Sequence, residues 1–552
     1  MSLRPVVVQQ VAEETARVAR AAFPKGNAYL RLYDELGPLY TDQQFAALFP
    51  TRGQPGLSPA QLAMVTIFQF AEGLSDRQAA DAVRARIDWK YVLGLPLEDP
   101  GFDASVLSEF RTRLLTHEAA RLLLTALLER CREAGLLTAR GRQRTDSTHV
   151  VAASHALNRL ELVGETLRHA LNVLASVAPG WLRAVAPPAW YERYTPRLAE
   201  YRLPKTEPAR QALAEQIGAD GRQLLLALAA PDAPAWLREV PAVEVLRRVW
   251  LQQYHAPDAG GVVRWRAAGD LPPAAQHINS PHDPEARYSV KRETVWTGYE
   301  VHLTETCDAD RPQLVSDVQT TAATTPDCAV TAEIHSALAR ADLLPGIHLV
   351  DGGYVDGEHL ATSHREHGID LVGPAPADQS WQAQAGKGFD AASFTFDWAA
   401  RQATCPQGHT SVKWSETQGK RGAAVVNIRF PRATCAACPC RADCTRATAG
   451  GREITVRPED QHQALQAARA RQQTPEFQDL YHLRAGIEGT HSQGLRRCGL
   501  RQARYIGAAK AHLQHLLIAV ALNVLRLAAW FAEQPRARTR QSPFAKLALA
   551  GT

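Results

Sequence analysis

The sequence predicts an α/β protein that begins with a helical region and continues into a mixed set of strands and helices. Helical signals fill residues 1–135, where Ser58 and Pro59 form a helix start ahead of a run of apolar residues. Strand signals follow in residues 142–151 and again after residue 287, where TVWTGYEVHLTE alternates apolar and polar side chains. At 552 residues the chain is long enough for three or four units with a large buried core.

Composition and charge are those of an ordinary globular protein. Charged residues make up 22% and hydrophobic residues 45% of the chain, and the net charge is only +5. A site for a polyanion must therefore come from local clustering of basic residues. The N-terminus lacks the apolar core of a signal peptide, and the longest apolar run, residues 513–530, is interrupted by His515, Asn523 and Arg526. We expect that run to be a buried helix and the protein to be cytoplasmic, without a membrane span.

Two short helices in the N-terminal region are separated by a glycine. Gly73 ends the first, which is rich in apolar residues, and Ser75 with Gln78 caps the second. Two such helices joined by a glycine turn suit a helix-turn-helix that binds DNA, and they suit any small helical bundle equally well. Both interpretations stay open at this point.

Two acidic residues stand next to strand signals. Asp146 lies in the segment RQRTDSTHVV, which predicts a strand that ends in an exposed acid. Asp351 follows the apolar strand 347–350 and precedes two glycines. Folds of the α/β class place metal ligands at strand ends of this kind, because the backbone opens outward there. Each acid is a candidate metal ligand, with a turn or capping residue as the alternative.

The stretch from Tyr481 to Lys510 contains one acid among many basic residues. Tyr481, Arg484 and Glu488 are spaced i, i+3 and i+7, so on a helix they share one face. That face offers a carboxylate to a metal and N–H donors to phosphate oxygens, with a solvated surface helix as the alternative. The basic residues around Glu488 are Arg484, His491, Arg496, Arg497, Arg501, Arg504 and Lys510.

Asp146, Asp351 and Glu488, far apart in the sequence, form a set suited to divalent cations. Mg²⁺ prefers a few carboxylates together with water and phosphate oxygens. Two such ions about 3.5–4 Å apart activate a nucleophile and stabilise the leaving oxygen of an in-line displacement. The sequence therefore predicts a metal-dependent site for phosphoryl transfer.

Nine cysteines are present, and four of them crowd between residues 435 and 444. In a cytosolic chain such crowding favours a metal over disulfides. Residues 374–458 read as hairpins with few large apolar side chains, a setting in which a tetrahedral Zn²⁺ site stabilises the fold. His409 lies close by, Cys440 competes with Cys444 for the fourth place, and free buried thiols are the alternative. The expected ligands are Cys405, Cys435, Cys438 and Cys444.

Four segments together resemble the DDE transposases of bacterial insertion sequences, most closely those of the IS1182 type and more loosely the IS4-like group. The segments are RQRTDSTHV, SPHDPEARYSVKRETVWTGYEVHLTETCD, LVDGGYVDGEHL and YHLRAGIEGTHSQGLRRCGLRQARYIG. The N-terminal region also resembles the helical domain that precedes the catalytic core of this family. The resemblance covers most of the chain, and it strengthens the expectation that residues 1–135 bind DNA.

The resemblance implies an RNase H-like core in which Asp146, Asp351 and Glu488 are a triad that binds Mg²⁺ or Mn²⁺. A helical insertion and the Cys-bearing β insertion would fill the wide gaps between the three acids. The implied units are residues 1–135 (helical and DNA-binding), 140–155 with 287–373 and 459–535 (catalytic core), 156–286 (helical insertion), 374–458 (zinc-bearing β insertion) and 536–552 (flexible tail).

The third acid lies in a partial match to the Tyr, Arg, Glu and Lys signature of the IS4-like group. Tyr481, Arg484 and Glu488 fit it, whereas the Lys position, seven residues after the acid, is Leu495 with Arg496 beside it. The resemblance and the clustering of bases together imply the DNA-binding residues Tyr481, Arg484, Arg496, Arg497, Arg501 and Arg504.

The predicted activity is that of a DNA transposase. It would bind terminal inverted repeats, cleave the ends of its element and join the freed 3′ ends to target DNA, as a homodimer in the synaptic complex and in association with the nucleoid. A metal-dependent nuclease on the same fold and a domesticated, non-catalytic DNA-binding protein are the alternatives. An intact triad argues against the second of these.

Overall fold

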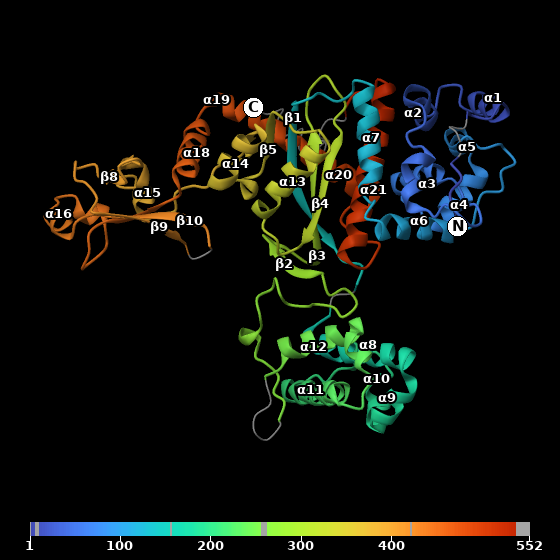
Figure 1. Cartoon of the computed structure of the whole chain (residues 1–552), viewed down its shortest axis with the longest axis horizontal. Coiled ribbons are helices and arrows are strands. Elements are labelled where there is room, and N and C mark those ends of the chain that lie inside the picture. Colours follow the sequence, from blue (N-terminus) through green and yellow to red (C-terminus); the bar gives the residue numbers. More distant parts are fainter. Residues whose placement is uncertain (1, 6–9, 155–156, 256–261, 420–421, 537–552) are drawn as a thin grey trace, which may run out of the picture.

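The computed structural model describes residues 2–5, 10–154, 157–255, 262–419 and 422–536. The molecule is elongated, with a β-sheet in its middle, N-terminal helices at one end and the Cys-bearing segment at the other (Figure 1). A second group of helices lies below the sheet in the same view. Except for Arg536, the predicted tail 536–552 is outside the described residues.

The N-terminal region is helical, as the sequence predicts. The side chain of Ser58 accepts a hydrogen bond from the backbone N–H of Gln61, and Gly73 ends the helix in the left-handed conformation with φ of 71°. A capping box between Ser75 and Gln78 starts the next helix. The helices are α1 (Glu13–Ala22), α2 (Ala28–Leu36), α3 (Pro59–Glu72), α4 (Asp76–Ala85), α5 (Ile87–Leu93), α6 (Ser105–Thr116) and α7 (Leu122–Glu133).

The central sheet is mixed, and the predicted α/β class is confirmed. Strand β3 pairs antiparallel with β1 along one edge, and with β2 and then β4 along the other. On the far side of β1, strands β5 and β6 continue the sheet in parallel, so the order is β2-β3-β1-β5-β6 with β4 beside β3. The strands are β1 (Arg142–Val151), β2 (Arg287–Lys291), β3 (Thr294–Thr306), β4 (Val315–Ala322), β5 (Ile347–Val350) and β6 (Asp370–Val372).

Helices cover both faces of this sheet. Helices α13 (Cys328–Arg340) and α14 (Gly357–His367) lie to one side, whereas α20 (Ile487–Cys498) and α21 (Ala508–Phe531) lie to the other (Figure 1). Helix α21 is the only described helix long and apolar enough to cross a membrane, but 78% of its apolar window is buried inside the protein. The expectation of a buried core helix agrees with this burial.

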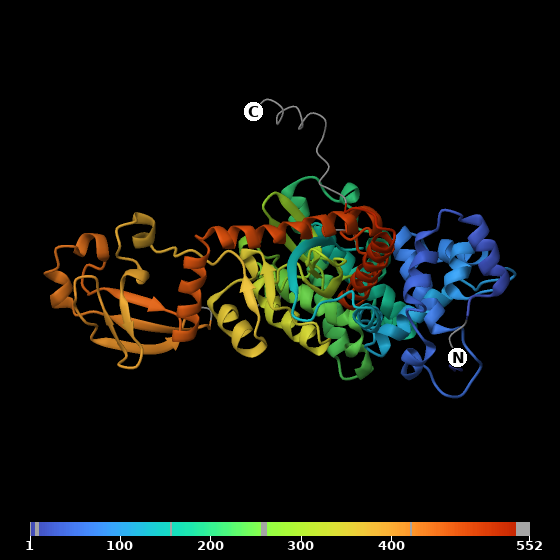
Figure 2. The same cartoon turned by 90° about the horizontal axis from the view of Figure 1, so that it is seen from above.

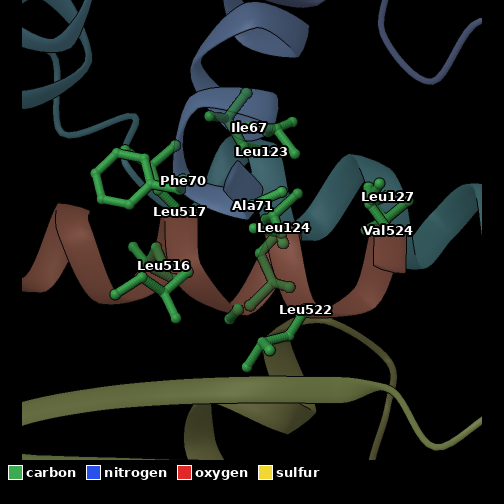
Figure 3. Close-up of a cluster of buried hydrophobic side chains, with 14 of the residues drawn as sticks. Ile67, Phe70, Ala71, Leu123, Leu124, Leu127, Leu516, Leu517, Leu522 and Val524 are labelled. Carbon is green, nitrogen blue, oxygen red and sulfur yellow. The ribbon is translucent and has the colours of Figure 1, made fainter. Parts of the chain in front are cut away.

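One hydrophobic cluster joins the N-terminal helices to the sheet through α21. Leu517 and Val524 of α21 face side chains of α3 and α7 such as Phe70 and Leu127, and all four are fully buried (Figure 3). The same cluster continues into β3 and β4. The N-terminal helices are therefore built onto the core and do not form a separate globule.

The helical group between β1 and β2 has a core of its own. Leu167, Leu224 and Leu246 are buried in it, as expected for the apolar stripes of three packed helices. The elements are α8 (Arg159–Val177), α9 (Pro179–Val185), α10 (Pro188–Tyr194), α11 (Glu207–Ala229) and α12 (Pro241–Gln253).

The Cys-bearing segment 374–458, called the Cys module below, projects from the core (Figure 2). Its three-stranded sheet has the order β11-β10-β9, and a small hairpin pairs β7 with β8. Phe394, Val426 and Ile454 belong to a buried cluster, so the module has a small apolar core, contrary to the expectation from its composition. The elements are α15 (Trp381–Ala385), β7 (Thr395–Asp397), β8 (Gln402–Thr404), β9 (Lys413–Gln418), β10 (Ala424–Arg429), α16 (Arg432–Ala436), α17 (Arg441–Cys444) and β11 (Glu453–Val456).

Candidate active site

The first two acids lie side by side because their strands are paired in parallel. Thr145 of β1 is opposite Val350 of β5, so the next positions along the two strands are Asp146 and Asp351. Gly353, two residues after Asp351, lies against Asp327. A side chain would not fit there, since a Cβ would lie 2.7 Å from a carboxylate oxygen of Asp327. The sheet register and the glycine turn thus place two carboxylates at one edge, as predicted for Asp351.

The expectation that a strand ends at an exposed Asp146 is wrong. Strand β1 continues to Val151, and the Asp146 side chain is only 13% exposed because helix α20 packs over that face. Burial raises the pKa of Asp146 to about 6, against the lowering effect of Arg484, and the nearby Glu488 and Asp351 add to the rise. A bound cation would relieve this crowding of negative charge.

Glu488 reaches the same place from the far end of the chain. The expected continuous helix is interrupted, because α19 (Pro475–His482) gives way to a 3₁₀ turn at Leu483–Gly486 before α20 begins at Ile487. Gly486 is needed in the turn, since a Cβ there would lie 2.0 Å from the guanidinium of Arg144. Tyr481, Arg484 and Glu488 therefore do not share one regular helix face, yet all three lie near the acids of the sheet.

Arg484 is the common partner of all three acids. Its Nη2 donates to Oδ2 of Asp146 at 2.5 Å and lies 3.8 Å from Oδ1 of Asp351, while its Nη1 lies 3.3 Å from Oε1 of Glu488. Asp351 and Glu488 are 51% and 63% exposed, so the site opens to solvent on that side. The arrangement shows that one cationic group can bridge the three carboxylates.

His491 belongs to the site although the sequence analysis does not single it out as a ligand. Ligand atoms of Asp146, Glu488 and His491 all lie within 4.8 Å of one another. The imidazole is buried, and its Nε2 has no hydrogen-bond partner among the described residues. Burial lowers the pKa of His491 to about 4, so the ring is neutral at pH 7 and able to ligate a metal. The Glu-x-x-His spacing is the signal that could have revealed it.

A second acidic group lies on the opposite face of β1 and β3. Ligand atoms of Glu300, His302 and Asp327 are also within 4.8 Å of one another. The ammonium of Lys291 lies 3.7 Å from Glu300 and 3.6 Å from Asp327, so this group already has a cation supplied by the chain. The hydroxyl of Ser147 donates to Asp327 at 3.0 Å, which fixes β1 next to the residue that carries the first acid.

The four predicted DNA-binding arginines beyond Arg484 have different surroundings. Arg496 and Arg497 are exposed on the last turn of α20. Arg501 donates to the hydroxyl of Thr148 at 2.8 Å, so it lies along β1. Arg504 stacks on Phe70 at 4.7 Å and donates to a backbone carbonyl of the N-terminal region, so it contributes to packing between the two regions.

The four predicted zinc ligands line one cavity of the Cys module. Cys405, Cys435, Cys438 and Cys444 surround it, and Cys440 does not. The backbone N–H of Arg452 donates to the sulfur of Cys435 at 3.4 Å, the kind of contact that stabilises a thiolate. Among the described residues, no three thiols lie as close to one another as the ligand atoms of the two acidic groups do.

Two family models match the chain. One, described as a transposase DDE domain, matches residues 404–528, and the other, described as a transposase domain (DUF772), matches residues 17–113. Both matches are to transposase domains, so the chain is similar to the DDE transposases. The pair of matches is typical of IS1182-family transposases, in agreement with the resemblance seen in the sequence. No curated protein and no solved structure matches the chain.

The matched ranges cover only part of the candidate site. The DDE match includes Glu488, His491 and the four cysteines of the cavity, but it begins after Asp146 and Asp351. The case for the first two acids therefore depends on sheet register and on their contacts with Arg484. Transposases of this family typically use a divalent metal, and the described residues include two groups able to hold one.

Proposed function

We propose that this transposase binds the terminal inverted repeats of its element, cleaves the element ends and transfers the 3′ ends to target DNA. The convergence of Asp146, Asp351 and Glu488 on the guanidinium of Arg484 is the observation that carries the proposal. Carboxylates brought together from two strands and a helix, and open to solvent on one side, suit divalent cations and a phosphate substrate.

The sheet supports an RNase H-like core. Strands β4, β3, β1, β5 and β6 follow one another across the sheet, antiparallel on one side of β1 and parallel on the other. That order and those directions are the ones expected of an RNase H-like fold, in which the first strand is central. The first acid then lies on the central strand, and the second follows directly after its parallel neighbour β5.

The donor set fits a divalent metal, for which Mg²⁺ or Mn²⁺ is our proposal. Asp146, Glu488 and His491 would hold the ion, with Asp351 beside them, and the orphaned Nε2 of His491 is the observation that supports this fit. Metal ions bound there would activate the attacking oxygen and stabilise the leaving oxygen of the phosphodiester.

The side chains around the acids position the DNA. Arg484, 16% exposed between the carboxylates, can donate N–H groups to a phosphate that approaches the site once a metal ion binds the acids. Arg496 and Arg497 extend this basic surface along α20. Tyr481 lies next to Asp351, and burial raises its pKa to about 12, so it keeps its hydroxyl proton as a donor.

The N-terminal helices are our proposed contact with the terminal repeats. Helix α4 follows the glycine turn, and its exposed face carries Arg77, Gln78 and Arg84. Side chains of these types contact phosphates and base edges when a helix lies in a major groove. We further propose that two copies act together on the two ends of the element, in the cytoplasm and on the nucleoid.

A DNA-joining assay distinguishes this function from the two alternatives, a metal-dependent nuclease and a non-catalytic DNA-binding protein. Purified protein, DNA carrying the element end and a target plasmid should give cleaved ends covalently joined to the target when Mg²⁺ or Mn²⁺ is added. Cleavage without any joining would favour the metal-dependent nuclease. Binding of the ends without cleavage would favour a domesticated DNA-binding protein.

His491→Ala should weaken metal binding selectively. Imidazole nitrogen matters more to Co²⁺ than to Mg²⁺, so the affinity for Co²⁺ should fall about 10–100-fold and that for Mg²⁺ less. Calorimetric titration of each ion into the wild-type and variant proteins measures the two affinities. An equal loss of affinity for both ions, together with a lower melting temperature, would mean that His491 contributes to packing and does not bind the metal. His359→Ala on α14 serves as the control.

We also propose a structural Zn²⁺ in the Cys module. Cys405, Cys435, Cys438 and Cys444 surround one cavity, and four thiolates leave no open position for water. Cys438→Ser should lower the zinc content from about one ion per chain to near zero, and make the module sensitive to protease before the rest of the protein.

The control for this prediction is Cys440→Ser, because Cys440 lies outside the cavity lining and should keep the metal. Replacing Cys131, Cys307, Cys328 or Cys498 should also leave it bound. Elemental analysis of the purified proteins gives the answer, and a wild-type protein with well under one zinc per chain and free thiols contradicts the proposal.

A further inference from the structure

The Cys module carries the whole net charge of the protein. Residues 374–458 contain 11 Lys and Arg but only 6 Asp and Glu, a net charge of +5. The full chain has 62 basic and 57 acidic residues, so the remainder of the chain has 51 of each and is neutral. A local excess of this kind in a DNA-processing protein points to a polyanion.

The strand register shows where part of this charge lies. In the three-stranded sheet, Val426 and Ile428 of β10 are buried with the apolar residues of β11, so alternate residues point away from the core. Arg429 is paired with Lys413 of β9 on one side and with Glu453 of β11 on the other. These three exposed side chains form one row across the outer face.

Two further rows complete the outer face. Ser415, Asn427 and Thr455 form the second row, and the hydroxyl of Thr455 donates to Oδ1 of Asn427 at 2.7 Å. Arg457 follows on the same side of β11, one register step beyond the pair of Val426 with Val456. The outer face therefore carries three cations, one acid and a polar centre, and Val425 is its largest apolar side chain.

The acid on this face does not neutralise it. Glu453 forms an ion pair with Arg429 at 2.6 Å, and both side chains are more than half exposed. Lys413 has no acidic partner among the described residues. The module projects at the end of the molecule opposite the N-terminal helices (Figures 1 and 2). Most side chains of the outer face are exposed, so no other described element covers that face.

We propose that the outer face of β9, β10 and β11 binds duplex DNA through its phosphates, without sequence preference, beyond the DNA held at the active site. The proposal rests on the proposed function only in taking DNA as the substrate. Lys413, Arg429 and Arg457 supply the charge, and the side-chain amide N–H groups of Asn427 between them are further donors to phosphate oxygens. A face without large apolar or aromatic side chains suits a backbone contact better than base stacking or a protein interface.

The test is the salt dependence of DNA binding by the full-length protein. Each phosphate contact contributes about 0.9 to the slope of log affinity against log salt concentration. Combining Lys413→Ala, Arg429→Ala and Arg457→Ala should lower that slope by about 2–3 units, on a random-sequence duplex and on the terminal repeat alike. Glu453→Gln should act in the opposite direction and tighten binding, which a purely structural role of the face would not produce.

A matched control removes the same charge elsewhere. Arg183→Ala, Arg247→Ala and Arg248→Ala, all exposed on the helical group below the sheet, should leave the slope unchanged. Unaltered zinc content and circular dichroism establish that the module variants are folded.

The possible results distinguish a failure of the surface proposal from a failure of the proposed function. A wild-type protein that binds neither duplex defeats the proposed function itself. If the wild type binds both and the triple variant keeps its slope, the surface proposal is overturned. It is also overturned if the variant loses affinity for the terminal repeat alone, or if single-stranded RNA competes as well as duplex DNA.

Discussion

Replacing Asp146 with asparagine is expected to abolish DNA cleavage while leaving the binding of terminal-repeat DNA nearly unchanged. The change removes one of the negative charges that would hold a divalent ion and leaves the N-terminal helices untouched. Loss of about 4 kcal/mol of transition-state stabilisation lowers the cleavage rate about 10³-fold. Asp351→Asn and Glu488→Gln should act in the same way, and gel-shift and cleavage assays on the same DNA measure both effects.

The control for these variants is Asp342→Asn. Asp342 is 93% exposed and forms a surface ion pair with Arg132, so its loss should change neither binding nor cleavage. A triad variant that still cuts DNA at the wild-type rate would remove that residue from the site. Equal loss of binding and cleavage would mean that the residue supports the fold.

Glu305→Gln is expected to produce the largest loss of stability among single substitutions at ion pairs in this protein. The Glu305 carboxylate is fully buried, where it accepts hydrogen bonds from Arg144 at 2.7 Å and from Thr490 and Arg526 at 2.6 Å each. It therefore ties β3 to β1, α20 and α21. Removing its charge leaves two guanidinium groups in the interior without a counter-charge, at a cost of about 3–5 kcal/mol in the free energy of unfolding.

A fall of roughly 3–8 °C in melting temperature would match that cost in a chain of this size. Glu416→Gln is the comparison, because Glu416 and Arg401 form a surface ion pair with both side chains about two-thirds exposed. Its loss should cost less than about 1 kcal/mol. A similar melting temperature for Glu305→Gln and Glu416→Gln would contradict the conclusion that the buried Glu305 carboxylate stabilises the contact between these elements.

The same carboxylate gives stability a dependence on pH. Burial by itself would raise the pKa of Glu305, but Arg526 and Arg144 hold it below its ordinary value of 4.5. A group with a depressed pKa in the folded state contributes stability above its unfolded pKa and loses that contribution as the pH falls through the folded pKa. The wild type should therefore lose this stabilisation in the acid range below pH 4.5, whereas Glu305→Gln should not show that loss.

Local patterns in the sequence predict the strands and the position of Asp351 at a strand end. The alternation of apolar and polar residues in β3 and the glycines after Asp351 are local signals, and the structure has a strand and a turn at those places. Asp146 is harder, because what buries it is helix α20, which follows more than 300 residues later. Strand β1 therefore continues past Asp146 and beneath α20, a helix that is distant in the sequence.

Contacts that depend on several elements at once are not visible in the sequence. The helical spacing of Arg484 and Glu488 predicts their contact, which the structure has, but the bridging to Asp146 and Asp351 depends on elements that are far apart in the sequence. The choice between Cys440 and Cys444 depends on which thiol faces the cavity. The spacing of Glu488 and His491, by contrast, is a local signal that is open to sequence analysis.

The shared cluster around α21 has a consequence for how this protein changes over evolutionary time. Phe70, Leu127 and Leu517 belong to one packing arrangement, although they come from opposite ends of the chain. Recombination that brought in residues 1–135 from a related element would replace half of that arrangement and leave the other half unmatched. The Cys module has its own core and is open to exchange as a unit. New specificity for element ends is therefore expected to arise by gradual substitution together with α21, and not by acquisition of a foreign N-terminal region.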